Sequence, residues 1–384
     1  MFFYSFKNGL TTAAIDNNGP ISHLVLAFRA GSRYENAQIR RGLSLVWSSG
    51  SSGSKVWSFA SRDVFGVSLS VPRDQAPLAL SILGHVTAQP AFKPWELQDV
   101  VPTLHADRDY RNPIDIAIED AHRAAFRTGS LANSLYAARH DIGNIKSSAL
   151  VDFAAKQFVT GNGVLVGVNV DAEQLEYYGS SNAPINHGPA ASFVPSPYVG
   201  GDWRRSAASS NTTSVVFAGL GAGSADFDRL AVQAVLLESL NRACRSLQKN
   251  SSGVTFSAQP VQFVYEGAGL VGIQMTASGN GHKDVVGDLV SKTISTVKNA
   301  KFDKIEELRR AVANNIKSKE ECSQTTAVKT AVDVLSSSAD SEALPRAISK
   351  VRAEDVKAAL AGWLKKPSLS AYGSIANVPY VDQI

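Results

Sequence analysis

Apolar and polar residues alternate in two stretches of the chain, and each stretch predicts a half-buried β-strand. Phe65, Val67, Leu69 and Val71 alternate with glycine and serine, and the apolar residues within 271–277 alternate with smaller or polar ones. Successive side chains of a strand point to opposite faces of a sheet, so a period of two predicts one buried face. The strands start 206 residues apart (271 minus 65), which places one in each half of the chain.

Other landmarks recur around these strands in the same order, which indicates an internal duplication. Residues 21–32 (I-S-H-L-V-L-A-F-R-A-G-S) correspond to residues 213–224 (T-S-V-V-F-A-G-L-G-A-G-S) at an offset of 192 (224 minus 32). Each of these is an apolar strand that ends in Ala-Gly-Ser. Residues 145–158 and 351–364 also correspond, and both predict a capped helix that is followed by a last short strand.

A helix is predicted after each alternating strand, and a longer helical region follows that helix. The helix in the second half is amphipathic, because six residues share one face: Val286, Leu289, Val290, Thr293, Ile294 and Val297. Residues 92–95 and 302–305 open the longest helical stretches, at an offset of 210 (302 minus 92). The mixed order of strands and helices favours an α+β fold in which helices cover one face of each sheet.

The chain of 384 residues is therefore predicted to contain two homologous domains, each a mixed β-sheet covered by helices. The predicted domains are residues 1–178 and 202–384, and residues 179–201, rich in Pro, Gly and Ser, form the predicted linker. Between Ser32 and Phe65 the first copy is 14 residues shorter than the second (206 minus 192). This shortfall falls on the opening helix of the first copy or just after it.

Composition and charge narrow the class of protein. Hydrophobic residues make up 44% of the sequence and charged residues 19%, which suffices for two apolar cores. The net charge of +4 comes without a dense run of Lys or Arg, so nothing points to nucleic acid as a partner. Cys244 and Cys322 have no metal-ligand spacing, and so few cysteines indicate a reducing compartment rather than a disulfide scaffold.

Two further features bear on location. No apolar run approaches the roughly 18 residues that a membrane helix needs, so any membrane association is expected to go through a partner. The first ten residues, M-F-F-Y-S-F-K-N-G-L, have no basic leader and no sustained apolar stretch, and they predict neither a secretory signal nor a transit peptide.

A zinc peptidase helix needs two histidines four residues apart with a glutamate between them, because this spacing puts both rings on one face. None of the seven histidines has another within four residues. His105 with Asp109, and Glu119 with His122, are each one helical turn apart on the long helical segment. Such pairs could hold a metal in a displaced site, but an ordinary solvated or hydrogen-bonded pair is the expected role.

The sequence matches a dinucleotide-binding motif only weakly, and it contains no serine-nucleophile motif. G-L-G-A-G-S (residues 219–224) follows a strand and precedes a helix, but it lacks the third glycine and the acidic partner of a dinucleotide site. We expect a structural turn there, because the first copy has A-F-R-A-G-S at the same place. No G-x-S-x-G elbow occurs, so a serine nucleophile has no support.

The stretch A-G-S-R-Y-E-N, followed by G-L-S and a helix, resembles the opening of the pitrilysin-like zinc metallopeptidase family. The similarity covers nearly the whole chain and is greatest to the mitochondrial branch, which contains the processing peptidase subunits and the core subunits of ubiquinol:cytochrome c reductase. In active members G-L-S is followed by His, two residues, Glu and His, whereas this chain has Leu45, Ser48 and Ser49 there. A further glutamate ligand corresponds to about Leu104. The resemblance therefore implies no catalytic, metal-binding or cofactor-binding residue in this chain, because leucine and serine cannot replace imidazole and carboxylate as zinc ligands.

The resemblance also implies a role. A long glycine-rich loop marks the non-catalytic processing-peptidase subunit, and no such loop is visible near residues 248–256. Residues 265–274 and the C-terminal residues 368–384 are instead most similar to a core subunit. This implies a scaffold on the matrix side of the mitochondrial inner membrane, next to a second core subunit and to cytochrome b, cytochrome c1 and the Rieske protein, which carry the haems and the iron–sulfur cluster. The alternative is an inactive subunit that binds presequences for a processing peptidase.

Overall fold

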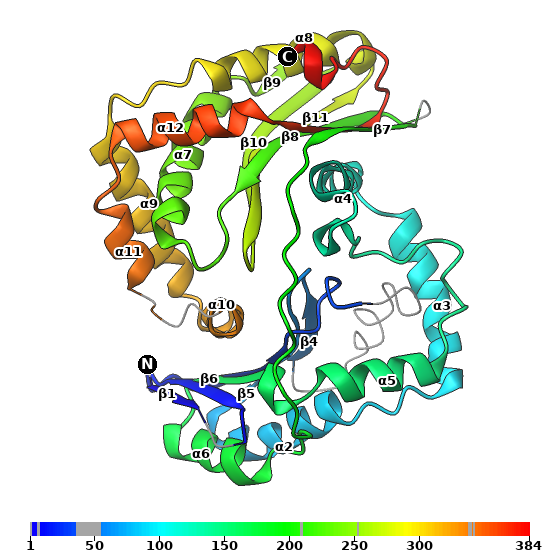
Figure 1. The fold of residues 1–384 in the computed structure, drawn as a ribbon, viewed down its shortest axis with the longest axis vertical. Helices are drawn as coiled ribbons and strands as arrows, with labels where there is room; N and C mark the ends of the chain where they lie inside the picture. Colours follow the sequence, from blue (N-terminus) through cyan, green and yellow to red (C-terminus); the bar gives the residue numbers. More distant parts are fainter. Residues whose placement is uncertain are drawn as a thin grey trace. The chain divides into compact units, whose positions relative to one another are not determined.

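The computed structural model describes residues 2–5, 8–35, 55–207, 210–251, 253–336, 340 and 342–384. These residues form two compact units, each built on a six-stranded sheet (Figure 1). Unit 1 comprises Met1–Tyr110, Asn133–Val194 and Lys317–Ala339, and unit 2 comprises Arg111–Ala132, Pro195–Ile316 and Asp340–Ile384.

The sheet of unit 1 has the strand order β1-β2-β6-β3-β5-β4. Its strands are β1 (Phe2–Ser5), β2 (Thr11–Ile15), β3 (Ile21–Phe28), β4 (Lys55–Ala60), β5 (Phe65–Pro72) and β6 (Gly163–Val168). Only the pairing of β2 with β6 is parallel within this sheet, and the other four pairings are antiparallel. The sheet is therefore mixed.

The sheet of unit 2 has the order β7-β12-β8-β11-β10-β9. Its strands are β7 (Gly201–Ser206), β8 (Thr212–Gly221), β9 (Lys249–Ser251), β10 (Val254–Tyr265), β11 (Ala268–Gly279) and β12 (Ser368–Gly373). The pairing of β7 with β12 is parallel and the others are antiparallel. The run β2-β6-β3-β5-β4 thus matches β7-β12-β8-β11-β10 strand for strand, which confirms the predicted duplication and the α+β fold.

Helices cover both faces of the sheet in unit 1. These helices are α2 (Ala76–Ala88), α3 (Pro94–Asp109), α5 (Ser147–Gln157), α6 (Ala172–Tyr177) and α10 (Ser323–Leu335). On one face α2 and α5 enclose a core in which the Phe28 and Phe65 rings stack on Phe158, with centroids 5.0 and 5.7 Å apart. On the other face α10 packs Ala327 and Ala331 against valines of β3 and β6.

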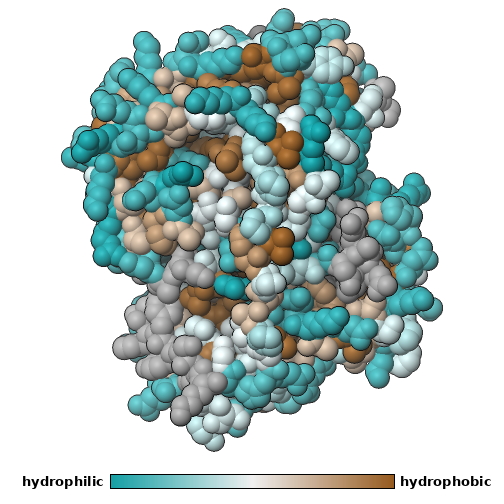
Figure 2. All heavy atoms as spheres, in the orientation of Figure 1, coloured by the Kyte–Doolittle hydropathy of each residue, from teal (hydrophilic) through white to brown (hydrophobic). Residues whose placement is uncertain are grey.

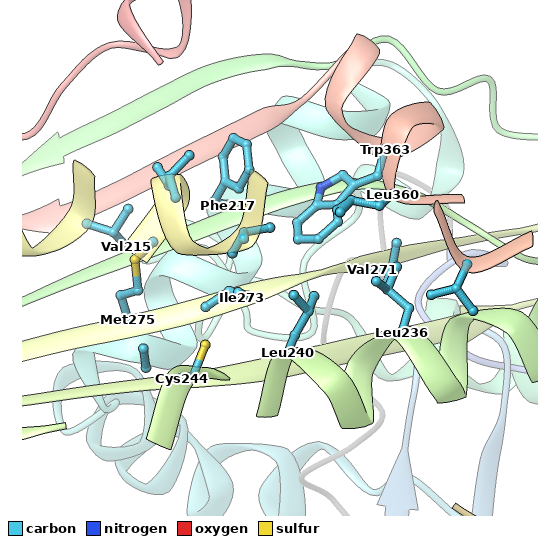
Figure 3. Close-up of a cluster of buried hydrophobic side chains, with 14 of the residues drawn as sticks. Val215, Phe217, Leu236, Leu240, Cys244, Val271, Ile273, Met275, Leu360 and Trp363 are labelled. Carbon is cyan, nitrogen blue, oxygen red and sulfur yellow. The ribbon is translucent and has the colours of Figure 1, made fainter. Parts of the chain in front are cut away.

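Unit 2 has the same arrangement. Its helices are α4 (Pro113–Phe126), α7 (Phe227–Arg245), α8 (His282–Lys298), α9 (Ile305–Glu320), α11 (Ala343–Ile348) and α12 (Ala353–Lys365). Figure 3 shows Leu236 and Leu240 of α7 and Trp363 of α12 directed at the strands from one face of the sheet. On the opposite face α4 packs its alanines on β8, and the Ser370 hydroxyl of β12 donates a hydrogen bond of 2.6 Å to the Ala117 carbonyl.

One helix of each sequence copy belongs to the unit of the other copy. The first copy contributes α4 to unit 2, and the second copy contributes α10 to unit 1. The compact units are therefore discontinuous in sequence, and they do not coincide with the continuous ranges 1–178 and 202–384, which remain a proposal for the extent of the two copies.

The expectation that helices cover only one face of each sheet is wrong. Ser68 and Gly66 lie on the face of β5 that the alternating pattern assigned to solvent, yet both are buried, because α10 packs on this side of the sheet. The second alternating strand, β11, is half-buried as expected, because its polar residues Gln274, Thr276 and Ser278 are partly exposed.

Each of the predicted long helical stretches is two helices, and the longest helix among the described residues is α7 with 19 residues. The first stretch breaks before Pro113, because proline disfavours helical geometry in the residue that precedes it. Asn112 has φ −63° and ψ 139°, an extended conformation, and α4 begins after it.

The predicted amphipathic face of α8 is confirmed, since Val286, Val290 and Ile294 are at most 2% exposed.

The acid Asp333 on α10 makes the stability of unit 1 dependent on pH. Burial raises the pKa of Asp333 to about 6; nearby Lys329 lowers it and Glu320 raises it. A raised pKa means that the folded state binds the proton more tightly than the unfolded state. Stability is therefore lost as the pH rises from about 4 to about 6, by up to about 3 kcal/mol for a shift of about two pKa units.

We expect Asp333→Asn to be more stable than the wild type at pH 8 and to lose this advantage at pH 4. Urea denaturation at the two pH values measures the difference. Asp303→Asn, at an exposed position, is the control and should change the free energy of unfolding by less than about 0.5 kcal/mol. An equal effect of Asp333→Asn at both pH values would contradict the prediction.

Hydrophilic residues cover most of the face drawn in Figure 2, with smaller apolar patches among them. Scattered apolar side chains of this kind are usual on folded proteins. Helix α2 carries a more ordered set of apolar side chains: Leu78, Ile82 and Val86 follow each other at intervals of four and are 65%, 48% and 43% exposed. The sequence of α2 contains no Asp, Glu, Lys or Arg, so this helix presents an apolar stripe without charge.

Candidate functional site

Of the four positions that the resemblance assigns to a lost zinc site, the structure describes one, Leu104. Leu45, Ser48 and Ser49 lie outside the described residues. The first copy is predicted to be 14 residues shorter than the second between Ser32 and Phe65. Residues 36–54 of this segment lie outside the described residues, so the difference in length stays a prediction.

The fourth position, Leu104, lies on α3 and is 8% exposed. Its side chain packs against Ala137 and Ile142 in a small apolar cluster of unit 1. Zinc takes nitrogen, sulfur and oxygen ligands, and a leucine in such a cluster offers none of these. The side chain at this position contributes packing.

The two histidine–carboxylate pairs lie on different helices and in different units. His105 and Asp109 are on α3 in unit 1, where the histidine is partly exposed and the aspartate exposed. Glu119 and His122 are on α4 in unit 2, and both are buried. Within the described ranges, no group of three or more His, Cys, Asp and Glu side chains is placed to hold a metal ion.

Both ring nitrogens of His122 are engaged within unit 2. Nδ1 lies 2.8 Å from the Ile118 carbonyl oxygen, and Nε2 lies 2.8 Å from the Tyr265 hydroxyl. The ring also packs edge-on against Phe263, with centroids 4.9 Å apart. A metal ligand needs a free ring nitrogen, so this histidine would have to break a buried hydrogen bond to bind one. Its geometry is that of a core histidine that joins α4 to β10.

A buried ion pair fixes α4 to the edge of the second sheet. The Asp120 side chain is fully buried, and its Oδ1 lies 2.7 Å from Nη2 of Arg205 on β7 and 3.5 Å from Nη1 of Arg123. Burial raises the pKa of Asp120, and the two guanidinium groups act in the opposite direction. The attraction to the arginines offsets part of the cost of burying the carboxylate. This arrangement serves packing and contains no nucleophile or metal ligand set.

The Ala-Gly-Ser turns are structural, as the sequence predicted for residues 219–224. In unit 1 the Ser32 N–H donates to the Ser61 carbonyl over 3.3 Å, and in unit 2 the Ser224 N–H donates to the Tyr265 carbonyl over 3.0 Å. A phosphate cradle needs backbone N–H groups that are free to face the anion. Here these donors are used to join each turn to a neighbouring strand.

The two cysteines have opposite environments. Cys244 is in the core of unit 2, and burial raises the pKa of its thiol to about 11. Cys322 is exposed, and a hydrogen bond with the Thr325 side chain lowers the pKa of its thiol. Cys244 is therefore a core thiol and Cys322 a surface thiol.

Part of the sequence matches a known protein family, and two solved structures share the fold of the chain. The pattern of the insulinase family (peptidase family M16) matches residues 40–139. A solved structure described as a peptidase M16 inactive domain from Pseudomonas fluorescens has the same fold, with a TM-score of 0.80 and 18% identity, over 97% of each chain. A chain of complex III2 from Candida albicans also shares the fold, with a TM-score of 0.85 and 17% identity, over 100% of this chain and 98% of that chain.

Similarity in sequence extends over the full length. The human cytochrome b-c1 complex subunit 2, mitochondrial, is 26% identical over 427 aligned positions, which cover 100% of this chain and 91% of the relative. The mitochondrial-processing peptidase subunit alpha-2 of Dictyostelium discoideum is 25% identical over 424 positions, covering 99% and 93%.

Residues 40–139 thus match the M16 peptidase family, and the two-unit α+β fold is shared with the M16 inactive domain. Over its full length the chain is homologous to subunit 2 of the cytochrome b-c1 complex, which is core protein 2. Within the described ranges, no helix combines the length and the apolar character needed to cross a membrane.

Sequence reasoning missed two features of the chain. It did not foresee that α4 and α10 each belong to the unit of the other copy, although both carry alanines at intervals of four, a spacing that permits close packing on a sheet. It also missed the pair of Asp120 and Arg205, which are 85 residues apart, and no local pattern could have joined them.

Proposed function

We propose that the chain is a non-catalytic structural core subunit, core protein 2-like, of the mitochondrial cytochrome bc1 complex. The observation that carries this proposal is the full-length homology to subunit 2 of that complex. A role in assembly and stability of ubiquinol:cytochrome c reductase follows from the resemblance, and it requires no chemistry in this chain.

The proposal includes a degenerate peptidase site. Active relatives place His, Glu and His where this chain has Leu45, Ser48 and Ser49. A serine hydroxyl binds zinc weakly and cannot act as the base that takes a proton from a zinc-bound water, and leucine can do neither. The apolar packing of Leu104 supports the same conclusion for the fourth position.

The proposed partners are a core protein 1-like subunit and the cytochrome b, cytochrome c1 and Rieske subunits, which would carry the haems and the iron–sulfur cluster. The proposed location is peripheral, on the matrix side of the mitochondrial inner membrane, through these partners. The uncharged stripe of Leu78, Ile82 and Val86 on α2 supports a role as a subunit, because ordered exposed apolar stripes mark interaction sites.

A second candidate is an inactive presequence-binding subunit of a mitochondrial processing peptidase. Full-length similarity to a processing peptidase subunit alpha-2 favours it. The two functions differ in the assembly that contains the chain, which is a large membrane complex with haem in the first case and a small soluble dimer in the second.

Native gel electrophoresis of detergent-solubilised mitochondria, with the chain detected by antibody, separates these functions. We expect the chain to migrate with the haem stain of the cytochrome bc1 complex and to be lost from that band when the complex is dissociated. Elemental analysis of the purified chain should give less than about 0.1 zinc per chain, and a chelator should leave its melting temperature unchanged. Migration in a small haem-free dimer, or one zinc per chain, would reject the proposed function.

A further inference from the structure

Three arginines line the junction of α4 with β7 in unit 2, and the proposed function does not use them. They are Arg123 of α4, Arg127 at the end of that helix, and Arg205 of β7. Strand β7 is an edge strand of the second sheet, so this arginine row lies at the rim of the sheet. Positive charges that gather in one place attract anions, which makes the row a candidate anion site.

Two of the arginines are placed against alternate residues of β7. Nη2 of Arg127 donates to the Gly200 carbonyl over 3.5 Å, and a Cβ atom at Gly201 would lie 2.9 Å from the same nitrogen. Two residues further along the strand, the Arg123 guanidinium lies over the ring of Trp203, 6.0 Å from its centroid. The glycine thus leaves the space that the Arg127 guanidinium needs beside the strand.

The third arginine joins the row through a shared carboxylate. Asp120 Oδ1 lies 2.7 Å from Nη2 of Arg205 and 3.5 Å from Nη1 of Arg123, so both guanidinium groups contact one oxygen. The charge of the neighbouring Glu119 also acts on Asp120. Three guanidinium groups against these two carboxylates leave a positive surplus. Like charges at this distance repel each other, and a bound anion would reduce that repulsion.

The arginines keep donors that are open to solvent. A guanidinium group has five N–H donors. Among the described residues, Arg205 and Arg123 each donate to Asp120 through one nitrogen, and their remaining nitrogens are not buried. The side chains of Arg205 and Arg123 are 38% and 27% exposed, whereas that of Asp120 is fully buried. An anion that approaches from solvent therefore meets guanidinium groups before it meets the carboxylate.

We propose that the arginine row binds a phosphate group of an organic molecule, with the organic part against the indole of Trp203. Guanidinium groups bind phosphate oxygens through pairs of N–H donors. A phosphate monoester carries three acceptor oxygens and a charge of about −1.5 to −2, so it can bind several guanidinium groups at once. Trp203 is 42% exposed and offers an apolar surface beside these charges. This inference concerns unit 2 alone and does not depend on the proposed function.

Isothermal titration calorimetry of the full-length chain with phenyl phosphate at pH 8 tests the proposal. We expect a Kd of about 1 mM or lower, which rises with the salt concentration because ions screen the attraction. Succinate, a dicarboxylate of similar charge, should bind more weakly, because each of its carboxylates carries a single charge.

The phosphate group could belong to a soluble molecule or to a lipid, and sedimentation with vesicles separates these sources. The chain is mixed with phosphatidylcholine vesicles that contain or lack phosphatidic acid. Sedimentation that depends on phosphatidic acid and on Arg123 would assign the row to lipid phosphates, and binding of phenyl phosphate alone would assign it to soluble ones.

A matched pair of variants locates the binding. Arg123→Gln removes one guanidinium from the row, and Arg310→Gln makes the same change at an exposed position of α9 outside it. A hydrogen bond to a charged group contributes about 1.5–3 kcal/mol. We therefore expect Arg123→Gln to raise the Kd of phenyl phosphate at least about tenfold and Arg310→Gln to leave it within about twofold.

Asp120→Asn separates anion binding from a general loss of structure. This variant keeps an oxygen for Arg205 but makes the row more positive, so the Kd of phenyl phosphate should fall by about threefold. A misfolded variant would bind more weakly. The proposal is overturned if neither phenyl phosphate nor phosphatidic acid binds, if succinate binds as tightly as phenyl phosphate, or if Arg123→Gln and Arg310→Gln have equal effects. A higher Kd for Asp120→Asn at an unchanged melting temperature would also overturn it.

Discussion

A fragment of residues 1–194 is expected not to fold into a stable unit 1, although it contains every strand of the first sheet. It lacks α10, which belongs to the second sequence copy. Without this helix the face of the sheet that carries Val25, Val164 and Val166, each fully buried in the full chain, would be exposed to water. The loss of several buried side chains, at about 1.5–3 kcal/mol each, is comparable to the whole stability of a domain.

Urea denaturation followed by circular dichroism measures this expectation. The fragment should show no cooperative unfolding transition. The matched control is the full-length chain with a protease site inserted after Val194, folded first and then cut, which keeps α10 available and should retain its transition. A cooperative transition of the isolated fragment, similar in midpoint to that of the cut chain, would show that α10 is dispensable.

Gly31→Ala is expected to lower the free energy of unfolding by about 3 kcal/mol or more, the upper range for overpacking in a rigid site. A Cβ atom at Gly31 would overlap the backbone carbonyl of Arg62 and lie 2.5 Å from the carbonyl oxygen of Ser61. The Gly31 N–H donates to the Asp63 carbonyl over 3.2 Å, which ties the same two segments together. The backbone cannot move away from the added Cβ atom without breaking this hydrogen bond, so the steric overlap would persist in the folded state.

The same substitution at Gly362 is the matched control. Nothing lies within 4 Å of its missing Cβ, and the residue is inside α12. Alanine is favoured over glycine in a helix by about 1 kcal/mol, so Gly362→Ala should stabilise the chain slightly. Denaturation of both variants in urea gives the comparison, and a cost below about 1 kcal/mol for Gly31→Ala would show that the turn tolerates a side chain.

Much of the fold could be predicted because its signals are local. The period of two in β5, the Ala-Gly-Ser endings of the strands and the amphipathic face of α8 each depend on neighbours in sequence, and the first two recur in the duplicated half. Gly31 lies in the first of the two Ala-Gly-Ser endings, and the close approach of the Arg62 and Ser61 backbone explains why a glycine stands there.

The remaining features depend on contacts between distant segments. Periodicity shows that a face is apolar, but it does not show which element covers that face, so the exchange of α4 and α10 had no local signal. The zinc positions Leu45, Ser48 and Ser49 were placed by resemblance to a family and not by any pattern of their own.

The exchange of helices sets the order in which the chain can complete its fold. The last strand of the first sheet, β6, ends at Val168, but the helix that covers its second face ends at Leu335, 167 residues later (335 minus 168). A chain that enters the mitochondrial matrix from its N-terminus, as the proposed location requires, delivers the whole first sheet before the helix that completes it. Until α10 arrives the sheet presents an uncovered apolar face, and we expect chaperones to bind this protein during its entry into the matrix.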